Sequence, residues 1–284
     1  MLYISDYDAK TVLAFPANER AGNAKPLATI PIGDVPVGLW VDRNGILYVA
    51  AFSAVYEFKP GATSPFQTIT SGITEALSVA VDANGTLYVA NADDKNVLVD
   101  EYAAGSTQPS LAFTITIPGT TIAFPGAMTF DPAGNLYVET AFESGGDHVF
   151  RFAPGATTGT DLRLEVVGGE DGLACDAEGN LYVGNGGSIN IYRSGHKRPY
   201  KTVVESSTMP SMFALTRAGA LYVPLSGNSF AQSSLQEFAR HEKGPVNGLT
   251  GDFEEPVGAA LQAEASEPTN FTTVPALQFH ESLR

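Results

Sequence analysis

One eleven-residue pattern recurs along the chain and constrains its fold more than any other feature. The pattern is apolar-x-apolar-Asp-x-x-Gly-x-Leu-Tyr-Val, and its last copy carries Thr216 in place of the aspartate. A half copy opens the chain at residues 2–4, and the repeat tyrosines follow one another at intervals of 40 to 49 residues. A period of this length is typical of repeat architectures. The full copies are 39–49 (LWVDRNGILYV), 79–89 (VAVDANGTLYV), 128–138 (MTFDPAGNLYV), 173–183 (LACDAEGNLYV) and 213–223 (FALTRAGALYV).

Each copy is expected to form two short strands joined by a tight turn. The aspartate can accept backbone N–H groups within the turn, and the glycine three residues later supplies a positive φ. Four antiparallel strands per repeat, without helical periodicity, predict an all-β fold: a six-bladed β-propeller. We expect third strands at 12–15, 55–58, 97–102, 149–152, 189–192 and 234–238, and fourth strands at 27–32, 66–70, 112–117, 162–167, 200–204 and near 246–249.

The first blade lacks an innermost strand because the chain begins at its second strand. Residues 255–261 (EPVGAAL) match 35–41 (VPVGLWV), so a C-terminal strand is expected to close the first blade and leave few exposed strand edges. The prediction is one propeller over 1–262 and a C-terminal tail over 263–284. Its blades are expected at 256–262 with 2–32, and at 36–71, 76–117, 124–168, 171–206 and 210–251.

The Gly-x-Leu-Tyr-Val core, followed by an apolar-x-Phe strand and a Pro-Gly-Ala turn, resembles the NHL-repeat propellers of bacteria. It is also similar to the wider six-bladed group of gluconolactonase-like, paraoxonase-like and strictosidine-synthase-like proteins. The resemblance covers roughly residues 2–262 and implies the fold. It does not imply one activity, because the repeated residues are structural and function is placed on the loops.

Composition excludes several classes of function. The formal charge is 16 − 31 = −15, which argues against a general nucleic-acid binder and disfavours docking on anionic lipid. The single cysteine excludes an internal disulfide and any zinc site with two cysteine ligands. No apolar run approaches ~18 residues, so we expect no membrane insertion.

Charges are expected to separate between the two faces of the propeller. The turns from second to third strands and the links between blades share one face, where the resemblance places most known sites. That face receives Asp6, Asp8, Asp34, Glu75, Asp93, Asp94, Glu143, Asp147, Glu170, Asp171, Asp252, Glu254 and Glu255, against Lys10 and Lys95. The opposite face collects Arg20, Lys25, Arg43, Lys59, Arg193, Lys197, Arg198, Arg217, Arg240 and Lys243.

The first functional hypothesis is a binding module that presents this acidic face to a protein, glycan or small-molecule ligand. A concentration of one charge sign attracts and steers a cationic partner. The same acids also serve as ordinary solvated loop residues, so charge alone does not identify a site. The residues assigned to the ligand face are Asp34, Glu75, Asp93, Asp94, Glu143 and Asp171.

The alternative hypothesis is a calcium-dependent lactonase or esterase with the metal at the channel mouth. Hard cations take carboxylate and amide oxygens, and bound Ca²⁺ would polarise a substrate carbonyl. Gluconolactonase-like relatives hold a channel metal with Glu, Asn and Asp, and residues 170–173 (EDGL) loosely resemble their acidic start of an inner strand without the following proline. The candidate ligands are Glu170, Asp171, Asn91, Asn185 and Glu255.

Other candidates for chemistry are weaker. His148 is the one histidine expected on the acidic face, where it could act as a general base or simply be an exposed loop residue. Cys175 replaces apolar residues of other repeats, which favours a buried small hydrophobe over a nucleophile. Residues 1–6 have neither a basic nor an apolar leader character, so we expect export if a leader has been removed and a cytoplasmic location otherwise. A monomer is expected, and whether the protein is an enzyme stays open.

Overall fold

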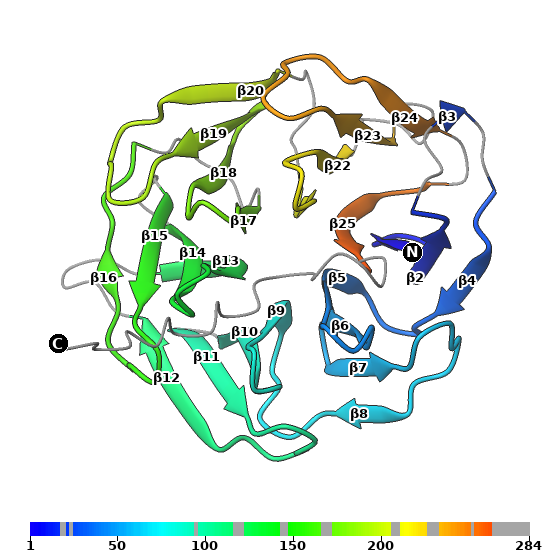
Figure 1. Cartoon of the computed structure of the whole chain (residues 1–284). Coiled ribbons are helices and arrows are strands. Elements are labelled where there is room, and N and C mark those ends of the chain that lie inside the picture. The colour runs from blue at the N-terminus through cyan, green and yellow to red at the C-terminus, as the bar shows by residue number, and fades with distance from the viewer. Residues whose placement is uncertain are drawn as a thin grey trace, which may run out of the picture.

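The protein is a ring of six antiparallel sheets, seen in a computed structural model that describes residues 1–17, 21–22, 25–93, 96–115, 122–142, 147–165, 172–205, 211–225, 233–250 and 253–262. Figure 1 shows the ring along its axis, with one strand of each blade lining the centre. The predicted six-bladed β-propeller is confirmed. The described residues contain no helix long and apolar enough to cross a bilayer.

The first three blades contain twelve strands, ordered from the axis outward. Blade 1 is β25 (Pro256–Leu261), β1 (Leu2–Asp6), β2 (Thr11–Phe15) and β4 (Ala28–Pro31); blade 2 is β5 (Pro36–Val41), β6 (Leu47–Ala51), β7 (Ala54–Phe58) and β8 (Gln67–Ile69); blade 3 is β9 (Ala76–Val81), β10 (Leu87–Asp93), β11 (Asn96–Tyr102) and β12 (Leu111–Ile115).

The other three blades follow the same order. Blade 4 is β13 (Ile122–Phe130), β14 (Leu136–Phe142), β15 (Asp147–Phe152) and β16 (Thr160–Asp161); blade 5 is β17 (Leu173–Cys175), β18 (Leu181–Asn185), β19 (Ser188–Tyr192) and β20 (Lys201–Glu205); blade 6 is β21 (Ala214–Leu215), β22 (Leu221–Leu225), β23 (Ser234–Phe238) and β24 (Asn247–Thr250), with β3 (Ala21–Gly22) added outside.

The ring is closed at blade 1 by both ends of the described chain. Strand β25 pairs antiparallel with β1, with Tyr3 opposite Ala260, as the sequence match predicted. A second closure was not predicted: β3 leaves blade 1 and pairs in parallel with β24 of blade 6, with Leu249 opposite Gly22. Figure 1 shows β25 (orange) beside the N-terminal strands (blue) and β3 at the rim near β24. The ring is therefore closed by strand pairing twice, within blade 1 near the axis and between blades 1 and 6 at the outer rim.

The repeat aspartate stabilises the turn between first and second strands as predicted. Oδ1 of Asp42 accepts hydrogen bonds from the backbone N–H groups of Asn44 and Ile46, at 2.9 and 2.8 Å. Gly45 has a φ of 78°, which a glycine adopts without steric cost. The same pair of hydrogen bonds is made by Asp82, Asp131 and Asp176.

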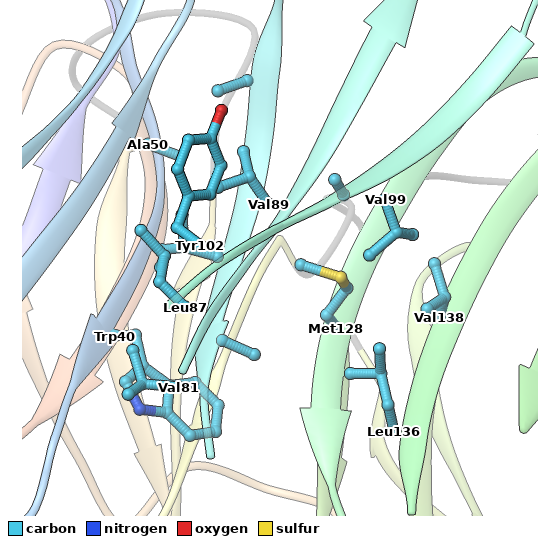
Figure 2. Packing of buried hydrophobic residues seen from close by; sticks show 14 of the residues in the cluster. Trp40, Ala50, Val81, Leu87, Val89, Val99, Tyr102, Met128, Leu136 and Val138 are labelled. Carbon is cyan, nitrogen blue, oxygen red and sulfur yellow. The ribbon is translucent and has the colours of Figure 1, made fainter. Parts of the chain in front are cut away.

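The interfaces between blades are apolar on both sides. Figure 2 shows Trp40, Val81 and Met128, from the inner strands of blades 2, 3 and 4, in one cluster with Tyr102. The rings of Trp40 and Phe130 lie 6.4 Å apart, edge to face. Blades 2 and 4 therefore meet although blade 3 lies between them in the ring.

The inner strands approach one another closely because small residues occupy one register position. A Cβ added to Gly38 would lie 2.7 Å from the carbonyl oxygen of Leu77 in the next blade. Gly258 occupies the same position in blade 1 and lies equally tightly against Val37 of blade 2. In blade 3 the position is Ser78, whose hydroxyl accepts a hydrogen bond from the Met128 N–H at 3.1 Å. Neighbouring inner strands therefore lie close together at the level of Gly38, Ser78 and Gly258.

The predicted fourth strand of blade 4, at 162–167, is wrong over 162–165, and residues 166 and 167 lie outside the described residues. The strand is β16, which ends at Asp161, and Arg163 has a φ of 51° that turns the chain out of the sheet. Leu162 and Leu164 then pack against the core between blades 4 and 5. The Leu162 N–H still donates to the Val149 carbonyl at 2.9 Å, and from Arg163 onward the described chain is held by apolar burial against the next blade and not by strand pairing.

Candidate functional site

The candidate site is the loop face, formed by the turns from second to third strands and the links between blades. Its described part is concentrated where blades 1, 2 and 3 adjoin. Asp8 and Glu254 are exposed, while Asp34, Glu75 and Glu255 are half-buried. Lys10 is the described cation among them.

Two buried side chains hold the links in place at equivalent positions of two repeats, three residues after the repeat tyrosine. The carboxylate of Asp6 accepts hydrogen bonds from the backbone N–H groups of Glu254 and Glu255, both at 2.8 Å. Asn91 Oδ1 accepts from Thr74 and Glu75, both at 2.9 Å. These anchors place Glu255 and Glu75 at matching points, each just before an inner strand.

Blade 2 has Ala51 at the anchoring position and anchors its link differently. The carboxylate of Asp34 accepts hydrogen bonds from the N–H of Val35 and from the N–H and hydroxyl of Ser53, at 2.7 to 2.8 Å. Partial burial acts to raise the pKa of Asp34, but the Ser53 and Val35 hydrogen bonds and the charge of Lys10 outweigh it, and the pKa is lowered. Asp34 is therefore a firmly ionised acid.

Aromatic rings accompany the carboxylates of this face. Tyr7 and Phe52 meet edge to face, with ring centroids 5.8 Å apart. The pKa of Tyr7 is raised by its partial burial and then by the negative charges of Glu255, Asp8 and Glu75. The pKa of Glu255 is raised by partial burial and by Asp8 and Asp6. The charges of Glu255 and Glu75, from the links that lead into blades 1 and 3, thus act on the same tyrosine.

The arrangement suits a cationic group. A carboxylate whose pKa is raised by burial and by neighbouring acids, as that of Glu255 is, becomes more stable in its charged form when a positive charge is placed beside it. A cation placed over the face of an aromatic ring is attracted to it, and Tyr7 and Phe52 supply such rings at this site. We define the acidic site as Tyr7, Asp8, Asp34, Phe52, Glu75 and Glu255.

Three of the predicted metal ligands lie within the described residues. Asn91 is buried, its amide oxygen receives the two backbone N–H groups, and its amide nitrogen donates to Gly72 O and Asp100 Oδ2, both at 2.7 Å. These four hydrogen bonds give Asn91 a structural role as an anchor, and its assignment as a calcium ligand stays a prediction. Asn185 occupies the same repeat position in blade 5, where its backbone carbonyl oxygen accepts a hydrogen bond from the Ser188 hydroxyl at 3.1 Å. Glu255 belongs to the acidic site.

The remaining predicted residues fall mostly outside the described part of the chain. Glu170 and Asp171, with the ligand-face residues Asp94 and Glu143, lie in segments that the structure does not describe, and of Asp93 the backbone alone is described, at the end of β10. In the described ranges, no group of three or more His, Cys, Asp or Glu residues is placed to hold a metal ion.

His148 lies in the outer half of blade 4, not beside the axis. Its Nδ1 is 3.0 Å from Oδ2 of Asp161 on the outermost strand, and its ring stacks on Phe150 at 6.4 Å. These contacts hold the ring against the outer strands, and its assignment as a general base on the acidic face stays a prediction.

The thiol of Cys175 is buried, as predicted. Burial, with the charges of Asp131 and Asp176, raises its pKa far above the ordinary value. A thiol kept protonated in this way is a poor nucleophile.

Sequence reasoning missed the anchors Asp6 and Asn91 and the aromatic pair Tyr7 and Phe52. A signal was present: the residue three places after the repeat tyrosine is Asp6, Asn91 or Asn185 in three blades. Buried polar residues at equivalent repeat positions indicate shared hydrogen bonds to the backbone.

Comparison with known proteins identifies the fold and goes no further. No protein-family model matches the chain, and no curated protein sequence matches it. Among solved structures, a protein of unknown function from Bacteroides caccae is similar with a TM-score of 0.69 and 12% identity, over 93% of this chain and 98% of that one. These values show a shared architecture.

Two further structures are similar over smaller shares. Regucalcin from Agrobacterium tumefaciens, a calcium-binding protein, has a TM-score of 0.58 and 12% identity, over 80% of this chain and 78% of that one. Hydrazine synthase from Kuenenia stuttgartiensis has a TM-score of 0.57 and 13% identity, over 72% and 62%. A regucalcin-like neighbour agrees with the expected resemblance to six-bladed propellers at the level of fold.

Proposed function

We propose that the protein is a β-propeller binding module whose acidic site captures a cationic group of a protein, glycan or small-molecule ligand. The observation that carries the proposal is the convergence of Glu75, Glu255 and Asp8 on Tyr7, beside Phe52. The site is preorganised, because backbone anchors hold Glu75 and Glu255 before a ligand arrives. Preorganisation lowers the entropic cost of binding.

Titration calorimetry with a tetralysine peptide tests the proposal. We expect binding at low ionic strength that weakens more than tenfold at high salt, because exposed charges are screened beyond the Debye length. The double variant Glu75→Gln/Glu255→Gln should bind at least fivefold more weakly than the unaltered protein.

The matched control is the double variant Glu178→Gln/Glu242→Gln, which changes the total charge equally on the opposite face. It should bind tetralysine like the unaltered protein. An equal loss of affinity in both double variants would mean that net charge, rather than the acidic site, attracts the peptide.

The second candidate is a calcium-dependent lactonase or esterase-type hydrolase. The observation that favours it is the similarity in fold to regucalcin, which is described as calcium-binding. In this hypothesis Glu170 and Asp171 would supply carboxylate oxygens, since Asn91 is engaged elsewhere. Bound Ca²⁺ would polarise a substrate carbonyl.

Thermal melts in EDTA and in millimolar CaCl₂ discriminate between the two functions. A ligand that binds the folded state at a hundredfold excess over Kd stabilises it by about 2.7 kcal/mol. A calcium-dependent rise that disappears in Glu170→Gln/Asp171→Asn would support the hydrolase and direct screening to lactones and esters. Identical melts would leave the binding module as the better description.

A further inference from the structure

We propose that the face opposite the acidic site docks peripherally on an anionic lipid surface through an arc of four consecutive blades. The arc comprises the turns between third and fourth strands in blades 5, 6, 1 and 2. Contacts between successive inner strands, β17 with β21, β21 with β25 and β25 with β5, make these blades neighbours in the ring.

The first observation is a row of exposed apolar side chains at one repeat position. In each blade the residue before the outer strand donates its N–H to the carbonyl of a third-strand residue: Leu27 to Ala14, Phe66 to Glu57, Tyr200 to Ile191 and Val246 to Glu237. Each of these acceptors lies opposite the repeat tyrosine of its own blade. The four residues therefore occupy equivalent places around the axis.

Within the described residues, the exposed large apolar side chains are these four and Leu111. The exposed fractions are 66% for Leu27, 48% for Phe66, 39% for Tyr200 and 52% for Val246. Equivalent positions of a ring lie at one level along its axis, so the four side chains share one plane at the rim. They are also separate from one another, each on its own blade.

The second observation is that the same blades carry cations beside these residues. Lys59 Nζ lies 5.6 Å from the ring centroid of Phe66, and Arg193 Cζ lies 4.7 Å from that of Tyr200, at equivalent turn positions. In these four turns the described carboxylate is Glu242, and the described cations are Lys25, Lys59, Arg193, Lys197, Arg198, Arg240 and Lys243. Arg198 and Arg240 form ion pairs with Glu165 and Glu178, which lie outside the turns, at 3.1 and 2.9 Å.

Blades 3 and 4 lack both features at this position. Their residues there are Ser110 and Gly159, and their turns, 103–109 and 153–158, contain no charged residue. A Cβ on Gly159 would lie 2.6 Å from the ring of Phe152, so this blade leaves no room for a side chain. Leu111 of blade 3 is 40% exposed but has no cation in its turn. Apolar exposure and positive charge thus occur together on the arc.

A lipid surface fits this pattern better than a protein partner does. Protein interfaces concentrate their energy in a contiguous, desolvated centre. Separate coplanar side chains, two of which have a cation against the ring, match a bilayer interface. There, apolar groups enter the headgroup boundary and Lys or Arg contact anionic headgroups. The net charge of −15 argued against such docking, but a sum over the whole surface does not describe one face, because distant charges are screened.

Sedimentation with vesicles tests this. We expect the protein to sediment with phosphatidylcholine vesicles containing one-third phosphatidylserine and not with pure phosphatidylcholine. Lys59→Gln/Arg193→Gln should weaken the binding about 25-fold, about fivefold per cation, which corresponds to about 1 kcal/mol each. Leu27→Ser/Phe66→Ser/Val246→Ser should weaken it more than tenfold, and Leu111→Ser, the matched control, should leave it unchanged.

Each of these variants alters exposed residues, and unchanged thermal melts would confirm that they fold. The proposal is overturned if the protein does not sediment with the anionic vesicles, or if the triple serine variant binds them like the unaltered protein. It is also overturned if a polyglutamate peptide competes with the vesicles at equal charge concentration, which would identify an acidic protein as the partner.

Discussion

The two ends of the blades differ in how their strand connections are hydrogen-bonded to the sheet. One end carries the turns between first and second strands, and the other carries the links between blades. At the turn end the same carboxylate, in Asp42, Asp82, Asp131 and Asp176, accepts the same two backbone N–H groups in four blades. At the loop end Asp6 and Asn91 anchor the links of blades 1 and 3, while Asp34 anchors that of blade 2 from within the link itself.

The difference concerns what each end is required to do. The turns have the same geometry in these blades, so the same aspartate makes the same hydrogen bonds in each and its repetition is visible in the sequence. The loop end varies because its links carry different side chains, including the acids of the acidic site. Function is placed on such variable connections, which a rigid scaffold positions. Substitutions at both ends can therefore test whether removing one anchor at the loop end lowers the free energy of unfolding more than removing one turn aspartate does.

The largest effect is expected from Asp6→Ala. This change removes the acceptor of two backbone hydrogen bonds at the ring closure, where Asp6 is buried. Hydrogen bonds to charged groups contribute roughly 1.5–3 kcal/mol each, so the free energy of unfolding should fall by about 3–5 kcal/mol. Urea unfolding at neutral pH measures this loss.

Asp6→Asn is the matched control, because Asn91 makes the equivalent hydrogen bonds with an amide oxygen. It should recover at least half of the stability that alanine removes. If Asp6→Ala lowers the free energy of unfolding no more than alanine at a turn aspartate such as Asp82 does, the loop end does not depend on its anchors.

The second prediction concerns a buried acid at one repeat position in two blades. Glu57 and Glu237 each pair with the repeat tyrosine of their blade. Burial, with the nearby charge of Asp42, raises the pKa of Glu57 to about 7, and the Gln67 hydrogen bond partly opposes the shift. A raised folded-state pKa means that the fold is most stable while Glu57 is protonated and loses stability as pH rises from about 4.5 to above 7.

Glu57→Gln should therefore stabilise the protein by about 3 kcal/mol above pH 7, and the gain should vanish below about pH 4.5. Urea unfolding across this pH range measures both limits. Glu237→Gln is the contrast, since Glu237 accepts hydrogen bonds from the Tyr222 hydroxyl at 3.3 Å and from Asn247 at 2.9 Å. It should cost about 1 kcal/mol. A pH-independent response of Glu57→Gln would contradict the prediction.

The same comparison explains how far the sequence predicted the structure. The blade number, the turns and the closure by β25 follow from residues that repeat, so pattern alone was sufficient. Strand β3 was not predictable, because two residues carry no alternation and their parallel partner is distant in sequence. The truncation of β16 depends on apolar burial against blade 5, a tertiary effect that overrides local strand preference.

The candidate site was predicted less well for the same reason. The acidic character of Asp34, Glu75 and Glu255 could be read from their places in the links. Whether a polar side chain is an anchor or a ligand depends on which backbone N–H groups face it, and that requires the assembled ring. Asn91 shows this, because its position suggested a metal ligand and its contacts make it a structural anchor.

A smaller effect is expected at the turn end, from Asp82→Ala. The substitution removes the acceptor of the Asn84 and Thr86 N–H groups, both at 2.8 Å, in a turn that water reaches. Water replaces much of the lost bonding, so the free energy of unfolding should fall by about 1–2 kcal/mol. A loss as large as that of Asp6→Ala would remove the contrast between the two ends.

The smallest effect is a gain, expected from Thr216→Asp in blade 6. The Thr216 hydroxyl already accepts the Ala220 N–H at 2.9 Å, and Gly219 keeps the positive φ of this turn. In the other turns one aspartate oxygen, Oδ1, accepts both backbone N–H groups. An aspartate at 216 would therefore also accept the N–H of residue 218, and should raise the free energy of unfolding by about 0.5–1 kcal/mol. Thr216→Asn is the control that separates hydrogen bonding from charge. If neither variant is more stable than the unaltered protein in urea, the repeated carboxylate specifies the turn geometry without adding to its stability.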